Sequence, residues 1–272
     1  MSDELFSLNG KVIVITGAAG LLGRHHAEVI SRNGGTPVLL DISQKIVDTL
    51  SRDLNSRYNV SAIGYEIDIT REDDVKKNCD QVIERFGHVD GLINNAANNP
   101  KVEGNGQNFS RLENFDLNTW NSDLAVGLTG AFLCSKYYGY AISKQGGAIV
   151  NISSDLGLIA PDQRLYHKPG LLPEEQPVKP VTYSVIKSGL IGLTRYLATY
   201  WADKNVRCNA ICPGGVQNNQ DPQFLESINS RIPMGRMARP NEYEGIILYL
   251  LSDASSYMTG SIISVDGGRT TW

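Results

Sequence analysis

Short, almost continuously apolar segments recur along this chain, and each is followed by a longer segment of mixed polarity and helical length. The apolar segments are rich in β-branched residues and lack a polar alternation, which is typical of strands in a parallel sheet covered by helices on both faces. We expect seven such strands, at residues 11–16, 37–41, 62–67, 89–94, 148–153, 206–212 and 262–265.

The segments between these strands have helix length and helix start signals. We expect helices at residues 21–32, 43–57, 71–86, 117–144, 181–204 and 240–252. Strands that alternate with helices imply right-handed crossovers and a doubly wound α/β sheet. No linker-like composition and no repeat interrupts the alternation, so residues 1–272 are predicted to form a single domain.

Two segments fall outside this alternation. Residues 98–112 are rich in Asn and Gly, and residues 161–180 carry five prolines. Because proline lacks a backbone donor and fixes φ, neither a helix nor a central strand is expected in 161–180. A loop of this length is usually functional or disordered. We interpret it as an insertion that faces the substrate, with a solvated or oligomer-contacting loop as the alternative.

Glycine is the one compositional excess, with 27 residues, and its position after the first strand is informative. There the chain reads Thr16-Gly17-Ala18-Ala19-Gly20-Leu21-Leu22-Gly23 and enters a helix. Gly17 allows a tight turn, Gly23 allows the helix to pack on the strand, and the helix N-terminus offers free N–H groups to a pyrophosphate. The pattern predicts a dinucleotide site at Gly17, Gly20, Leu22 and Gly23.

Asp41 ends the second expected strand. A carboxylate at this place accepts hydrogen bonds from the adenosine ribose hydroxyls and repels a 2′-phosphate. Ile42 and Ser43 follow it, so no adjacent arginine offsets that repulsion. We therefore predict NAD, with NADP as the less favoured cofactor; a role in capping the next helix is compatible with this.

Charge and cysteine usage exclude other classes of protein. The 25 basic and 29 acidic residues leave a net charge of −4, without the basic surplus that nucleic-acid binding needs. No apolar run has the length of a membrane span. The four cysteines form no CxxC pair and the histidines no ligand pattern, so we expect reduced core cysteines, no metal and a cytoplasmic location.

Further motifs follow the later strands. In chain order they are Asp68, Asn94-Asn95-Ala96-Ala97, Ser154, Tyr183-Ser184-Val185-Ile186-Lys187, Pro213-Gly214-Gly215-Val216 and Asp266-Gly267-Gly268. Together with the glycine turn, this series resembles the short-chain dehydrogenase/reductase family from residue 11 to residue 268. The resemblance implies a Rossmann-type seven-stranded sheet of order 3-2-1-4-5-6-7. It also implies cofactor contacts at Asp68, Ile69, Asn95, Ala96, Ala97, Tyr183, Lys187, Pro213, Gly214 and Val216.

The chemistry of the catalytic candidates follows from their residue types. Tyr183 and Lys187 are four positions apart on an expected helix and so share one face. A neighbouring ammonium favours the phenolate, so Tyr183 is predicted to act as general acid and base, and Lys187 to lower its pKa and hold the nicotinamide ribose. Ser154, with Ser153 as the alternative, is predicted to hydrogen-bond the reacting oxygen. The expected reaction is hydride transfer between nicotinamide and a secondary alcohol or ketone.

The sequence departs from the family pattern in three ways. Gly127 stands where the family usually has an Asn of the proton relay. The spacing of Gly17, Gly20 and Gly23 resembles the extended branch, which includes sugar-nucleotide epimerases and dehydratases, although the short C-terminal part favours the compact branch. The insertion 161–180 separates Ser154 from Tyr183. An epimerase or dehydratase with retained NAD, and a non-catalytic NAD-binding protein, are therefore alternatives.

The substrate and the assembly are predicted from the remaining features. The insertion must begin and end beside the active site, and it carries the polar and basic residues Gln163, Arg164, Tyr166, His167 and Lys168. These residues predict a polar substrate. More specifically, we expect an anionic sugar derivative that is phosphorylated or nucleotide-linked. The pattern also resembles dehydrogenases of surface-saccharide pathways. The resemblance implies a homodimer or homotetramer, which the aromatic surface of Tyr196, Tyr200 and Trp201 supports.

Overall fold

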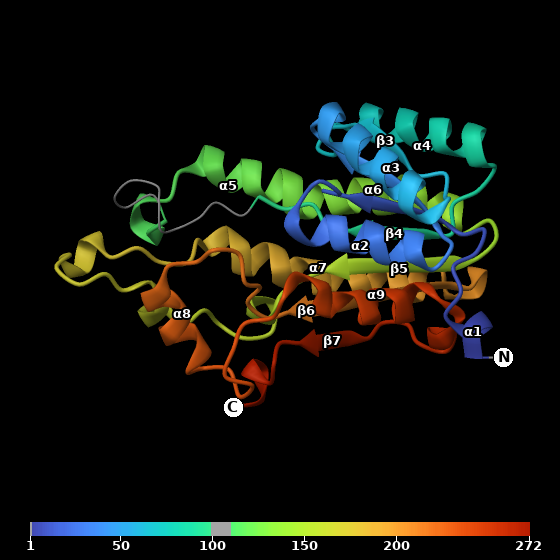
Figure 1. Ribbon diagram of the computed structural model, residues 1–272. Helices are drawn as coiled ribbons and strands as arrows, with labels where there is room; N and C mark the ends of the chain where they lie inside the picture. Colours follow the sequence, from blue (N-terminus) through green and yellow to red (C-terminus); the bar gives the residue numbers. More distant parts are fainter. Residues whose placement is uncertain (1, 99–109) are drawn as a thin grey trace.

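The computed structural model describes residues 2–98 and 110–272, so most of the expected loop 98–112 lies outside the described residues. Seven parallel strands form one sheet of order β3-β2-β1-β4-β5-β6-β7, which confirms the predicted fold (Figure 1). The strands are β1 Val12–Thr16, β2 Thr36–Asp41, β3 Ile63–Glu66, β4 Gly91–Asn94, β5 Gly147–Ile152, β6 Val206–Pro213 and β7 Ile262–Val265.

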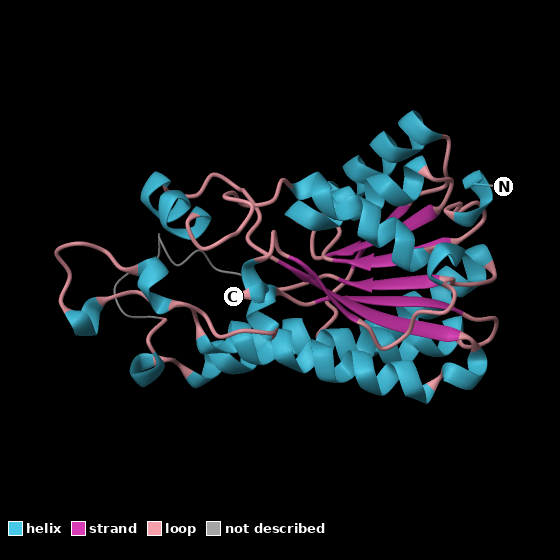
Figure 2. Ribbon diagram, turned by 90° about the horizontal axis from the view of Figure 1, so that it is seen from below, coloured by secondary structure: helices cyan, strands magenta, loops and turns pink. Residues whose placement is uncertain are grey.

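Helices cover both faces of this sheet (Figure 2). The side chains of a strand alternate between the two faces, so Ile13 and Ile15 of β1 pack on one side with α2, α3 and α9. Val12 and Val14 pack on the other side with α4, α6 and α7. The helices are α1 Ser2–Leu5, α2 Leu21–Arg32, α3 Gln44–Tyr58, α4 Glu72–Phe86, α5 Leu117–Leu124, α6 Gly130–Ile142, α7 Val181–Tyr200, α8 Pro222–Asn229 and α9 Glu244–Leu251.

Several helical segments differ from the sequence prediction; α1 was not predicted, and α7 ends at Tyr200, before the expected end at 204. The helix expected at 117–144 is divided into α5 and α6 by a π-helical turn, Ala125–Thr129. The helix expected at 240–252 begins as a 3₁₀ turn, Pro240–Tyr243, before α9. Helix α8 was not predicted, although Asp221 caps it by accepting from Gln223 N at 2.9 Å and Pro222 occupies its first position. Asp followed by Pro is a start signal that could have revealed it.

The insertion 161–180 lies beyond the carboxyl ends of the strands, next to α8 (Figure 1). It contains two 3₁₀ turns, Gln163–Tyr166 and Pro173–Glu175, and no α-helix or strand. Leu165 packs with Ile228 and Ile232 in a small core of its own. An ion pair between Asp162 and the Arg231 guanidinium, at 2.8 Å, fastens the start of the insertion to the end of α8.

Across residues 2–98 and 110–272, no helix is long and apolar enough to cross a membrane.

Candidate active site

A cleft of about 760 Å³ opens at the carboxyl ends of the strands. Nearly every site residue that the sequence predicted lines it. These are Gly17, Gly20, Leu22, Asp41, Asp68, Ile69, Asn95, Ala96, Ala97, Ser154, Tyr183, Lys187, Pro213, Gly214 and Val216. Gly23 does not line the cleft, because it packs α2 against the glycine turn: a Cβ there would lie 2.3 Å from the Gly17 carbonyl oxygen.

The glycine turn forms a cradle for which only a bare backbone has room. Gly17 has a φ of +62°, and a Cβ on it would lie 2.8 Å from Ala96 Cα. Helix α2 begins at Leu21, and its N-cap Gly20 provides no side-chain cap, so the first N–H groups of the helix have no capping side chain bonded to them. Amides of this kind are the usual binding site of a phosphate.

Asn95 holds this turn in place. Its side-chain amide donates to the carbonyl oxygens of Thr16 and Gly17, both at 3.0 Å. The Thr16 hydroxyl in turn accepts from the backbone N–H groups of Asn95 and Ala96, each at 3.0 Å. The motif that follows β4 therefore fixes the shape of the turn that follows β1.

The acidic residues at this end of the cleft are also oriented by the backbone. Asp41 accepts from Ala19 N and Ile42 N, both at 2.9 Å. Asp68 accepts from the N–H and the hydroxyl of Thr70 through one carboxylate oxygen, Oδ1. Of the described residues that line the cleft, the only cations are Lys179, Lys187 and Arg269, which lie at the end that contains Tyr183.

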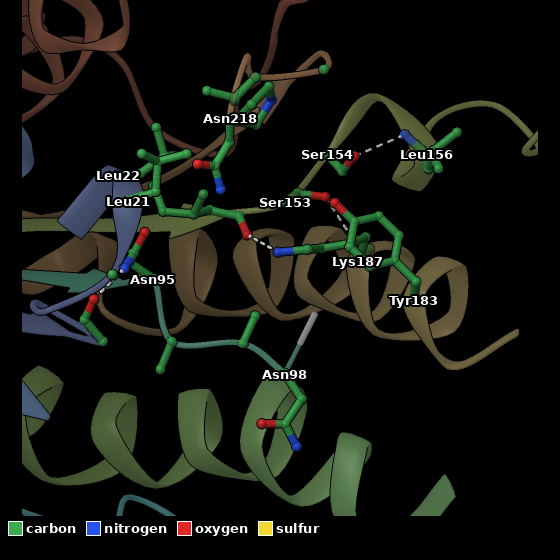
Figure 3. A pocket seen from close by; sticks show the side chains of 18 of the residues that line it. Leu21, Leu22, Asn95, Asn98, Ser153, Ser154, Leu156, Tyr183, Lys187 and Asn218 are labelled. Atoms are coloured by element: carbon green, nitrogen blue, oxygen red, sulfur yellow. Dashed lines mark hydrogen bonds between the residues drawn. The ribbon is translucent and has the colours of Figure 1, made fainter. Parts of the chain in front are cut away.

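Helix α7 presents Tyr183 and Lys187 toward the end of β5, which carries Ser153 and Ser154 (Figure 3). Lys187 is 6% exposed, and its ammonium donates to the Ile152 carbonyl at 2.8 Å. Burial, together with the nearby Lys179, lowers the pKa of Lys187 to about 8. Ser153 donates to the Lys187 carbonyl at 2.7 Å, which favours Ser154 over Ser153 as the hydroxyl that meets a substrate.

The environment of Tyr183 corrects one sequence-based expectation. Burial raises the pKa of Tyr183, and the Asp155 carboxylate acts in the same direction. A side-chain hydrogen bond with Ser154 and the charge of Arg269 lower it. The Lys187 ammonium lies 5.7 Å from the centre of the tyrosine ring and is bonded to a backbone carbonyl. The predicted lowering of the tyrosine pKa by Lys187 is therefore not what this geometry gives.

The basic residues of the insertion also differ from the expectation. Neither Arg164 nor Lys168 is among the described residues that line the cleft. Arg164 is 83% exposed in its side chain and pairs with Asp162 at 2.8 Å. Lys179 lines the cleft instead, with its ammonium 3.9 Å from the centre of the Tyr183 ring.

Several lining residues were missed from the sequence because they come from segments without a recognised motif. The substrate end is walled by the insertion and α8, where the rings of Tyr166 and Phe224 lie 5.8 Å apart. An apolar pair at this wall could only have been found by knowing that the two segments meet. Tyr166 was among the insertion residues that the sequence assigned to the substrate; the missed residues include Val126, Asp155, Leu156, Leu165, Lys179, Asn218, Gln220, Phe224, Ile228, Met237 and Arg269.

Gly127 lies in the π-helical turn and faces α7. A Cβ at this position would lie 2.7 Å from Ile186 Cγ2 and 3.1 Å from Ile186 Cδ1. The room that a side chain at position 127 would need is therefore filled by the residue next to Lys187. Packing explains why this position is glycine here.

Comparison with known proteins agrees with this geometry. A model of the family "short chain dehydrogenase" matches residues 11–166, and one described as "Enoyl-(Acyl carrier protein) reductase" matches residues 175–270. The 3-oxoacyl-(acyl-carrier-protein) reductase FabG of Thermotoga maritima is 32% identical over 96% of this chain and 98% of its own length.

The descriptions of two further similar proteins name different cofactors. The NADP-dependent mannitol dehydrogenase of Hypocrea jecorina is 34% identical over 98% of this chain and 95% of its own. A crystal structure of NAD⁺-bound xylitol dehydrogenase superposes with a TM-score of 0.82 at 28% identity, covering 96% of this chain and 99% of that one. The chain belongs to the short-chain dehydrogenase/reductase family of nicotinamide-dependent oxidoreductases.

Proposed function

We propose that this protein is an NAD-dependent oxidoreductase that transfers a hydride between nicotinamide and a secondary alcohol or ketone, with Tyr183 as general acid and base. One observation carries the proposal: Ser154, Tyr183 and Lys187 meet at one end of a cleft whose other end is the glycine turn and Asp41. The chain thereby offers a proton-transfer group and a dinucleotide cradle in one continuous space.

The residues fit a dinucleotide along the length of the cleft. The Gly17–Gly20 turn and the α2 N-terminus would hold the pyrophosphate, and Asp41 the adenosine ribose hydroxyls. When bound, the cofactor supplies or accepts the hydride. Lys187 keeps two ammonium donors beyond the one that binds Ile152, and these suit the nicotinamide ribose. Asp68 and Ile69 would meet the adenine, and Pro213, Gly214 and Val216 the nicotinamide carboxamide.

The preference for NAD over NADP rests on Asp41. Its carboxylate is aimed by two backbone N–H groups, and the described cations that line the cleft all lie at the other end. A 2′-phosphate at this position would meet a negative charge with no lining cation to offset it.

The proton chemistry follows from the neighbours of Tyr183. In ketone reduction the phenol donates its proton to the developing alkoxide, and in alcohol oxidation the phenolate accepts the hydroxyl proton. Because burial raises the pKa of Tyr183, the protonated form dominates at neutral pH, which suits the reduction direction. Ser154 would hold the same oxygen by a hydrogen bond.

The proposed substrate is a polar, anionic sugar derivative, of the kind used in surface-saccharide pathways. The cation that supports this is Lys179, which stands over the Tyr183 ring where a substrate group would enter. Its backbone N–H donates to Gln163 Oε1 at 2.8 Å, so the insertion sets its position. Relatives described as mannitol and xylitol dehydrogenases support a polyol-like substrate.

The proposal is tested by following NADH formation with sorbitol, sorbitol 6-phosphate and D-gluconate, of which the last two each carry an anionic group at one end of the polyol, at opposite ends. We expect oxidation of an anionic member and its loss in Tyr183→Phe. A Tyr183→Phe variant with full activity would refute the proton-transfer role. Cofactor that co-purifies with the protein and yields no net NADH would instead favour an epimerase or dehydratase, which the glycine spacing resembles.

A homo-oligomer in the cytoplasm completes the proposal. Tyr196 and Tyr200 on α7 are 60% and 57% exposed, and their rings stack at 5.4 Å on the surface. Trp201, by contrast, packs against Gly139 and serves the core. All four cysteines are buried and unpaired, as in a reducing compartment. Light scattering distinguishes a dimer from a tetramer.

A further inference from the structure

A buried ion pair lies directly beside the proposed catalytic hydroxyl. The Arg269 guanidinium contacts the Asp155 carboxylate at 2.6 Å, and the two side chains are only 8% and 4% exposed. Both residues line the cleft. Arg269 comes from the last turn of the chain, Arg269–Thr271, whereas Asp155 immediately follows Ser154 at the end of β5. Burying two charges costs desolvation energy, which their mutual attraction offsets only in good geometry, and removal of one partner leaves the other charge uncompensated.

The carboxylate of Asp155 is held by three donors. Oδ2 accepts from Arg269, and Oδ1 accepts from the Ser154 hydroxyl and from Leu156 N, both at 2.8 Å. A serine hydroxyl has a single proton. Ser154 gives that proton to Asp155, so the carboxylate sets the direction in which the hydroxyl points, and the hydroxyl must turn the proton toward a substrate oxygen before it can hold that oxygen. Leu156 N also donates to Ser154 Oγ, at 3.2 Å, which further fixes the orientation.

The turn that precedes Arg269 directs its side chain into the cleft. Asp266 accepts from Gly268 N and from Thr270 N, both at 2.9 Å, and Gly268 has a φ of +89°. The left-handed glycine turns the chain back so that residue 269 points inward. The Asp266-Gly267-Gly268 motif therefore delivers a cation to the catalytic end.

We propose that Asp155 and Arg269 form a positioning pair for the reaction: Arg269 holds the Asp155 carboxylate, and Asp155 fixes the direction of hydrogen bonding at Ser154 and so the proton transfer at Tyr183. The inference rests on the proposed function, because it assigns a role within that same site. In this inference the turn Arg269–Thr271 contributes to the reaction, because the positive charge of Arg269 holds the Asp155 carboxylate.

The two members of the pair act on Tyr183 in opposite directions. Asp155 raises the pKa of Tyr183 and Arg269 lowers it. Among the described residues, Lys187 on the same helix and Lys179 before it also place an ammonium near the ring.

Two uncharged titratable groups also belong to this environment. Tyr243 packs near Tyr183 from the 3₁₀ turn before α9, and burial raises its pKa. Cys212 of β6 lies near Asp155 and Lys187, and burial raises the pKa of its thiol. Both groups are neutral around pH 7. In the ion pair, by contrast, one substitution removes one charge and leaves the opposite charge uncompensated.

The test is the pH profile of kcat/KM for Arg269→Met, Asp155→Asn and the double variant, on whichever polyol the wild type oxidises. Oxidation of the polyol needs the Tyr183 phenolate, so kcat/KM falls as the pH drops through the apparent pKa of Tyr183. Arg269→Met leaves the Asp155 carboxylate uncompensated, so we expect this apparent pKa to rise by about one pH unit, a tenfold fall in the concentration of phenolate at a pH below it. Asp155→Asn should move it in the opposite direction. The double variant should return the apparent pKa toward the wild-type value but keep a kcat below that of the wild type, because the amide introduced by Asp155→Asn no longer fixes the direction of hydrogen bonding at Ser154. Arg269→Lys, which keeps the positive charge, should shift the apparent pKa less than Arg269→Met does.

Arg57→Met is the matched control, because Arg57 pairs with Glu28 and Asp53 outside the cleft and should leave the profile unchanged. Shifts of the same sign in both single variants, or unshifted profiles in folded protein, would overturn the inference. Should the single variants not fold, the double variant decides: wild-type kcat at every pH would mean that the pair only stabilises the fold. A Tyr183→Phe variant that stays active removes the proposed function itself, independently of these outcomes.

Discussion

The packing of Gly127 against Ile186 predicts an unusual response to a helix-stabilising substitution. Replacing glycine by alanine inside a helix normally stabilises it by about 1 kcal/mol. At position 127 the new methyl group would lie 2.7 Å from Ile186 Cγ2, well inside van der Waals contact. Overpacking of this kind costs about 1–3 kcal/mol. We therefore expect Gly127→Ala to lower the free energy of unfolding by about 1 kcal/mol.

The assay is urea unfolding, with Gly192→Ala as the matched control. Gly192 lies in α7, and a Cβ there would meet nothing within 4 Å, so this substitution should stabilise by about 0.5–1 kcal/mol. Combining Gly127→Ala with Ile186→Ala should remove the clash, so the two effects should be non-additive by about 1 kcal/mol or more. If Gly127→Ala stabilises the protein as much as Gly192→Ala does, the packing explanation is wrong. The same clash implies that Gly127→Asn would lower activity instead of restoring a family-like relay.

Three further predictions concern the cleft. Asp41→Ala should raise KM for NAD about tenfold, because charge-assisted hydrogen bonds are worth about 1.5–3 kcal/mol. It should also reduce the ratio of kcat/KM for NAD to kcat/KM for NADP, and steady-state kinetics with both cofactors measures both effects. Lys179→Met should lower kcat/KM about tenfold for the anionic polyols and leave sorbitol unchanged, with exposed Arg164→Met as control; an equal loss for sorbitol would contradict anion recognition. Because burial lowers the pKa of Lys187 to about 8, its ammonium is present below that pH and lost above it, so KM for the cofactor should rise above pH 8, and a flat profile would argue against a ribose contact.

The insertion shows how far residue types alone can mislead. Its basic character was read correctly, but the sequence could not say which cation turns inward. Arg164 lies two residues from Asp162 and pairs with it on the surface. Lys179 lies at the far end of the insertion, where the chain enters α7 and passes the Tyr183 ring. Which side of a loop faces a cleft depends on its contacts with α8, and those are made between segments distant in the sequence.

The sequence by itself determined the strands of the sheet, their parallel arrangement and the position of the glycine turn, and the family resemblance added the strand order. Those follow from local signals: apolar runs of strand length, start signals of helices, and a glycine turn whose backbone conformation excludes a side chain. Only the tertiary structure decided the electrostatics around Tyr183. The Asp155–Arg269 pair joins residues 114 positions apart, and the Gly127–Ile186 contact joins two helices. Burial and long-range contacts set pKa values and available space, and neither is written in the spacing of neighbouring residues.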